Sequence, residues 1–202
     1  FSALAQEAGM QNLKSLRSWA SARANRAEIK SLTIGHISTD LLIEGGLSRP
    51  VDLDLSTSFA VVRNPFTRVE SLYWYFRKIG RLDLTVPFHR FVESILRKRP
   101  EVGPWHSTGF SQAAPMVSWV RTRRWRGPQH ILRFETLERD YRAFAEKNHI
   151  PPRLPKKNIR GKDTGTVEWK SSTIGMVLEL YEDDFTAFGY GREPPQAPHH
   201  SA

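Results

Sequence analysis

A short apolar run, a charged turn and a helix follow one another at residues 59–76, and this order constrains the fold more than any other part of the chain. Phe59 to Val62 has the composition of a buried strand and ends at Arg63. Asn64-Pro65 then opens a helix, because asparagine caps helices and proline suits their first position. In α/β proteins an anion pocket forms where a strand ends and the next helix begins. The sequence therefore predicts an anion pocket here, with positive potential added by the helix N–H groups.

Two side chains suit this pocket. Arg63 can direct two parallel N–H donors at a phosphate, and Ser71, two turns into the helix, can add a hydroxyl donor. The alternative is that Arg63 caps a loop, while Arg68 and Glu70 form a solvated face of the helix.

This stretch resembles the 3′-phosphate-binding motif of sulfotransferases that use 3′-phosphoadenosine 5′-phosphosulfate (PAPS). The family form is an apolar strand followed by Arg-Asn-Pro-aromatic-x-Arg-x-x-Ser-x-Tyr. The matching positions are Arg63, Asn64, Pro65, Phe66, Arg68, Ser71 and Tyr73. The resemblance implies that Arg63 and Ser71 bind the 3′-phosphate of PAPS, and that sulfuryl transfer here needs no metal.

Three later segments extend the resemblance. Residues 131–141 are similar to the family element Arg-Phe-Glu-x-Leu-x-x-Asp, in which we expect Phe134 to pack and Glu135 to begin a helix. Residues 154–158 resemble Leu-Pro-x-x-Asn and belong to a basic loop that would suit the phosphates of the nucleotide, so the resemblance implies that Lys157 and Asn158 help to bind the cofactor. The alternative is a plain solvated lysine loop. Residues 178–190 look like the family's terminal helix. Over residues 31–190 the chain is most similar to family-2, carbohydrate-type sulfotransferases.

Two histidines are candidates for the base that takes the acceptor's proton, since histidine titrates near neutrality. His36 follows Gly35 at the end of a predicted strand, a position similar to that of the catalytic histidine in heparan sulfate 2-O-sulfotransferases. The alternative is that His36 caps a helix or packs on the edge of the sheet. His106, in a loop over 104–112, is the second candidate, and its alternative is simple exposure.

Helical spacing of apolar residues predicts helices in four later segments: 65–79, a segment from Pro87 with Phe88, Phe91 and Val92, about 135–148 with Phe144 inward, and about 171–183. Strands that alternate with such helices predict an α/β fold with a parallel sheet covered on both faces. The strand ends at His36, Arg63 and Phe134 should then line one crevice. The resemblance implies a P-loop-NTPase-like sheet flanked by helices. We expect one domain over residues 1–190 and a disordered tail over 191–202.

One part of the family pattern has no match in this chain. The family places a Lys-Thr/Ser-Gly-Gly-Thr-Ser-like loop after its first strand to hold the 5′-phosphosulfate, whereas a helix is predicted here at residues 1–9. Either the chain is truncated at its N-terminus or the protein has lost half of its cofactor site; we expect truncation, with the N-terminal strand and phosphate loop missing.

Composition limits the partners. A net charge of +9 and a pI near 10.1 indicate an anionic partner, without choosing among anions. The resemblance implies a hydroxyl-bearing acceptor, in particular a saccharide, and no nucleic acid. Without cysteines or an apolar run long enough to span a bilayer, the chain is expected to be cytoplasmic and bacterial-like, or in the Golgi lumen if eukaryotic.

Two other functions stay open. A nucleotide kinase could share the scaffold, but Gly-x-x-x-x-Gly-Lys-Ser/Thr is absent and the Arg63 motif does not favour it. A non-enzymatic basic module could bind nucleic acid or an acidic glycan through interleaved arginines and tryptophans. These residues are Arg121, Arg123, Arg124, Arg126, Trp119 and Trp125.

Overall fold

The computed structural model describes Thr39, Ile43 and residues 49–98, 112–122, 125–154 and 165–195. The elements predicted before residue 38 and the end of the tail lie outside these ranges. The chain divides into two compact units: residues 1–58 with 101–129, and residues 59–100 with 130–202. A single domain over residues 1–190 stays a prediction.

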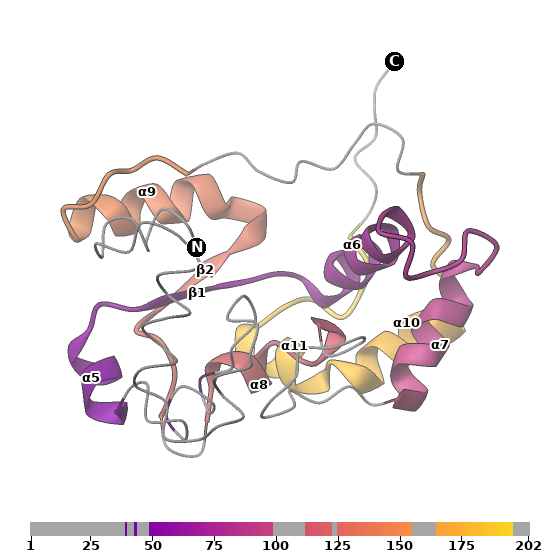
Figure 1. Ribbon diagram of the computed structural model, residues 1–202, viewed down its shortest axis with the longest axis horizontal. Helices are drawn as coiled ribbons and strands as arrows, with labels where there is room; N and C mark the ends of the chain where they lie inside the picture. The colour runs from indigo at the N-terminus through magenta and orange to yellow at the C-terminus, as the bar shows by residue number, and fades with distance from the viewer. Residues whose placement is uncertain are drawn as a thin grey trace. The chain divides into compact units, whose positions relative to one another are not determined.

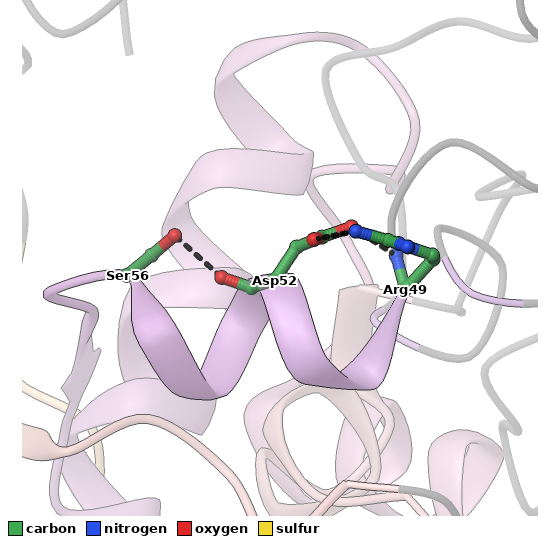
Figure 2. Close-up of polar contacts among 3 residues, drawn as sticks. All are labelled: Arg49, Asp52 and Ser56. Carbon is green, nitrogen blue, oxygen red and sulfur yellow. Dashed lines mark hydrogen bonds and ion pairs between the residues drawn. The ribbon is translucent and has the colours of Figure 1, made fainter.

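In the first unit, helix α5 (Pro50–Leu55) is closed at both ends by the side chain and carbonyl of Asp52. The carboxylate accepts the Arg49 backbone N–H at 3.2 Å and the Arg49 guanidinium at 2.6 and 2.9 Å. The Ser56 hydroxyl donates to the Asp52 carbonyl at 2.6 Å (Figure 2). The guanidinium lowers the pKa of Asp52, but the pair is exposed and contributes little to stability.

Trp125 belongs to the core of this first unit, which also contains helix α8 (Val117–Val120). Its indole N–H donates to Asp54 Oδ1 at 2.9 Å, and the Gln129 amide donates to the Asp54 carbonyl at 3.0 Å. The ring of Trp125 is therefore not presented for stacking on bases, contrary to what the basic-module alternative requires.

In the second unit, strands β1 (Phe59–Val62) and β2 (His130–Arg133) pair in parallel, which confirms the predicted parallel pairing. Phe59 lies opposite His130 and Val62 opposite Arg133. Both strands therefore end at the same edge, where β1 leads into helix α6 (Pro65–Lys78) and β2 leads towards helix α9 (Leu137–Lys147) (Figure 1). The mixture of helices with a small parallel sheet is compatible with an α/β sulfotransferase fold.

Helix α6 (Pro65–Lys78) and helix α7 (Phe88–Lys98) form where they were predicted. Gly80, with φ of +69°, ends the first of them in the left-handed region. Helix α7 packs against both α6 and helix α10 (Ser171–Leu180). The apolar residues that these two helices bury recur at helical spacing: Phe66, Val69, Tyr73, Phe76, Phe88, Phe91, Val92 and Ile95.

The segment after β2 differs from the prediction of a helix from residue 135. A 3-10 turn, η3 (Phe134–Thr136), comes first, and helix α9 (Leu137–Lys147) follows. Phe144 of α9 faces inward as predicted, with its ring 4.8 Å from that of Phe59 and 5.1 Å from that of His130.

The single helix predicted over residues 171–183 is two helices, α10 (Ser171–Leu180) and α11 (Glu182–Phe188). The break falls at Tyr181, whose backbone leaves the helical region while its side chain is fully buried. The acidic run Glu182–Asp184 then begins a new helix, because carboxylates are favourable in a first turn. Within the described ranges, no helix combines the length and apolar character that crossing a membrane requires.

Candidate anion-binding site

The turn from β1 to α6 is fixed by Asn64, which caps the helix. Its side-chain Oδ1 accepts the Phe66 N–H at 2.9 Å, and its carbonyl accepts the Arg68 N–H at 2.9 Å. Pro65 fills the first helical position, where a missing N–H costs nothing. The Asn-Pro pair therefore forms the predicted helix start.

Two backbone N–H groups of this turn, those of Asn64 and Phe66, already have protein partners. Pro65 has no N–H, the Phe66 N–H goes to Asn64, and the Asn64 N–H donates to Glu135 Oε1 at 2.7 Å. These groups cannot also bind an anion directly. The helix still contributes the positive end of its dipole, and the side chains beside the turn are the candidates for direct contacts to an anion.

Arg63 is held from two sides. Its Nε donates to the Thr67 hydroxyl at 3.1 Å, and that hydroxyl donates in turn to the Asn64 carbonyl at 3.1 Å. The guanidinium carbon lies 4.4 Å from the centre of the Phe134 ring. These two contacts orient the planar guanidinium at the carboxyl edge of the sheet, beside the first turn of α6.

Phe134 was predicted to pack, and to lie at a strand end that shares a crevice with that of Arg63; it packs on Arg63. Its side chain is 48% exposed, and its ring supports Arg63 rather than the hydrophobic core. It lies at the end of β2, where the alternation of inward and outward side chains stops.

Ser71 lies on the same side of α6 as Thr67, because residues four apart share a helix face. It is half-buried, and within the described part of the chain its hydroxyl has no hydrogen-bond partner. Arg63, Thr67 and Ser71 thus place a guanidinium and two hydroxyl groups along one side of the helix start.

Arg68, the second arginine of the motif, does not lie on a solvated face. Its guanidinium carbon is 5.5 Å from the ring centre of Tyr181, and it is half-buried. Burial raises the pKa of Tyr181 to about 12; the positive Arg68 opposes this shift, and the negative Asp184 adds to it. Arg68 is therefore part of the packing between α6 and the C-terminal helices.

Glu135 was not predicted from sequence to touch the β1–α6 turn. Its two oxygens accept from the Asn64 N–H and from the Tyr190 hydroxyl, the latter at 3.1 Å. These contacts join residues 55 or more positions apart, so no local pattern signals them. The only signal in the sequence was the position of Glu135, a charged residue directly after a predicted strand whose end should lie near that of the Arg63 strand.

The other predicted site residues lie outside the described ranges: His36, His106, Lys157 and Asn158. Their roles stay predictions. Among the residues that the structure describes, no three His, Asp or Glu side chains gather closely enough to hold a metal ion.

A comparison with protein families places the sequence of this chain in a known class. The model of the sulfotransferase family, in its family-2 form, matches residues 47–191, which include the whole anion site. The chain belongs to the sulfotransferase family, whose members transfer a sulfuryl group to a hydroxyl-bearing acceptor. Neither a curated protein nor a solved structure matches the chain.

Proposed function

We propose that this protein is a PAPS-dependent sulfotransferase that acts on a hydroxyl group of a carbohydrate, and that Arg63 and Ser71 bind the 3′-phosphate of the donor. The observation that carries the proposal is the doubly supported guanidinium of Arg63 at the end of β1. An arginine already held in place loses little conformational freedom when it binds an anion, so more of the contact energy appears as affinity.

The residues present fit such a donor. A phosphate dianion requires charge-assisted donors, which a guanidinium supplies in a planar pair and a hydroxyl supplies singly. The side of α6 that carries Thr67 and Ser71 offers both kinds of donor beside the positive end of the helix. We further propose that Lys157 and Asn158 contact the nucleotide, and that the complete fold is P-loop-like.

In this proposal the residues of the chain bind and orient the donor, and one of them takes a proton from the acceptor. PAPS, when bound, supplies the sulfuryl group. Arg63 and Ser71 fix its 3′-phosphate, which sets the distance to the acceptor. His36 takes the proton of the acceptor hydroxyl at an imidazole nitrogen, with His106 as the alternative base. Sulfuryl carries less charge than phosphoryl, so this transfer requires positioning more than a metal.

Calorimetric titration with adenosine 3′,5′-bisphosphate tests the proposal. Arg63→Ala removes a charged fork of donors worth about 1.5–3 kcal/mol per hydrogen bond, so its affinity should fall by about 100-fold or more. The affinity of Arg63→Lys should lie between those of the wild type and Arg63→Ala, since a lysine keeps the charge but not the planar pair of donors. Arg81→Ala, at an exposed position in the same unit, is the matched control and should bind like the wild type.

Adenosine 5′-phosphate separates this site from a general attraction between a basic protein and any nucleotide. The wild type should prefer the 3′,5′-bisphosphate, and Arg63→Ala should lose that preference. Equal affinity for the two nucleotides, or an Arg63→Ala protein that binds as tightly as the wild type, would refute the assignment of the 3′-phosphate.

A further inference from the structure

Tyr190, near the end of the described chain, is joined to the anion site by a short series of contacts. Its hydroxyl donates to Glu135 Oε2 at 3.1 Å, and Glu135 Oε1 accepts the Asn64 N–H at 2.7 Å. Asn64 directly follows Arg63 and caps α6. One carboxylate therefore connects the C-terminal segment to the turn that presents Arg63.

Tyr190 is itself fixed in place. The Arg133 guanidinium carbon lies 4.6 Å from the centre of its ring, and Arg133 Nη2 donates to the Phe188 carbonyl at 2.6 Å. Gly189, at φ of +62°, adopts the left-handed conformation that lets the chain turn back at the end of α11. The Tyr190 N–H then bonds the Phe185 carbonyl at 3.2 Å.

The chemistry of this pair keeps Tyr190 a hydrogen-bond donor. Burial, followed by the charge of Glu135, raises the pKa of the phenol well above its ordinary value. Its hydroxyl therefore stays protonated around neutral pH and can donate to the second oxygen of Glu135.

Glu135 also stands next to the residue that supports Arg63. It follows Phe134, whose ring lies 4.4 Å from the guanidinium carbon. A carboxylate at this place can attract the same guanidinium that is proposed to bind phosphate. With both oxygens bound, by the Asn64 N–H and the Tyr190 hydroxyl, Glu135 is held in a bridging position.

We infer that Tyr190 is a positioning residue for the anion site: through Glu135 it fixes the β1–α6 turn and keeps the Glu135 carboxylate from competing with the ligand for Arg63. The inference rests on the proposed function in so far as the ligand is a nucleotide phosphate. The coupling of Tyr190 to the turn is a property of the chain alone.

Two measurements on the full chain test it. The first is hydrogen exchange of the Asn64 amide by NMR, without ligand. Tyr190→Phe removes only the hydroxyl, so it should speed this exchange by about fivefold. The matched control is Tyr141→Phe, on α9, which removes a hydroxyl that donates to the Pro151 carbonyl. It should leave the exchange of the Asn64 amide unchanged.

The second measurement is the affinity for adenosine 3′,5′-bisphosphate. Tyr190→Phe should weaken it about fivefold, because Glu135 is released near Arg63. In the double variant Tyr190→Phe, Glu135→Gln, most of the lost affinity should return, because the glutamine amide can still accept the Asn64 N–H but carries no charge. A purely structural role for Tyr190 predicts no such rescue.

The outcomes are distinct. An Asn64 amide that does not respond to Tyr190→Phe overturns the inference, and so does a loss of affinity that Glu135→Gln deepens instead of restoring. If the wild type binds no nucleotide while the Asn64 amide responds, the proposed function fails and the coupling of Tyr190 to the turn stands.

Discussion

Thr67 is the residue whose hydroxyl decides how Arg63 lies. It accepts the Nε–H of Arg63 and donates to the carbonyl of Asn64, so it ties the side chain of the strand end to the backbone of the helix start. The Phe134 ring supports the other side of the guanidinium. The Thr67 hydroxyl, which directly follows Asn64-Pro65-Phe66 in the sequence, is therefore part of the site.

Thr67→Val tests this role at the residue scale. Valine has nearly the shape of threonine but no hydroxyl, so the Arg63 side chain loses one anchor while the helix keeps its packing. We expect the affinity for adenosine 3′,5′-bisphosphate to fall about five- to tenfold, from the loss of one hydrogen bond worth about 1 kcal/mol. The measurement is calorimetric titration, with the melting temperature followed in parallel.

Thr186→Val, on an exposed face of α11, is the matched control for the change from threonine to valine. It should bind nucleotide as the wild type does. If Thr67→Val also binds like the wild type, the hydroxyl does not orient Arg63.

At the scale of the element, α6 has two faces with different tasks. One face is buried and includes Phe66 and Tyr73, and the other carries Thr67 and Ser71 beside Arg63. The Asn64 cap fixes where the helix begins, and so sets where the residues of both faces lie relative to the end of β1. Cap and site are therefore coupled.

Asn64→Ala removes the side-chain acceptor of the Phe66 N–H. We expect the free energy of unfolding to fall by about 1 kcal/mol, the usual cost of losing a helix cap. Asn64→Ser keeps a side-chain oxygen at this position and should retain most of that stability. Urea denaturation measures both, and equal stability of the wild type and Asn64→Ala would show that the cap contributes nothing.

Several elements were predictable because their signals are local. Asn64-Pro65 defined the start of α6 and Gly80 its end, while the spacing of Phe88, Phe91 and Val92 defined α7. The break at Tyr181 was missed, because neither glycine nor proline marks it. Only the acidic run after it, in the first turn of α11, gave a signal.

The site was predictable only in part. Arg63 and Ser71 were identified from spacing and resemblance, and the structure brings them to one side of α6. The strand ends at Arg63 and Phe134 were predicted to line one crevice, but the individual contacts with Phe134, Glu135 and Tyr190 join segments far apart in the chain. Sequence alone gives the order of such segments but not which side chains meet across them.

At the largest scale, the site helix is held by aromatic contacts with the C-terminal part of the second unit. Phe66 of α6 lies 5.3 Å, ring to ring, from Phe185 of α11, and 5.2 Å from Trp169. Trp169 also meets Phe88 of α7 at 4.9 Å. Stability of the unit and position of the site therefore depend on different aromatic residues: Phe185 packs in the core, whereas Phe134 supports Arg63.

Phe185→Ala and Phe134→Ala separate these two tasks. Phe185 is 2% exposed, so its truncation leaves a cavity against Phe66 and should lower the free energy of unfolding by about 3–5 kcal/mol. Phe134 is 48% exposed, and its truncation should cost well under half of that, since much of its ring is already in water. Urea denaturation of both variants, beside the wild type, measures the contrast. Equal losses for the two would mean that Phe134 packs in the core after all.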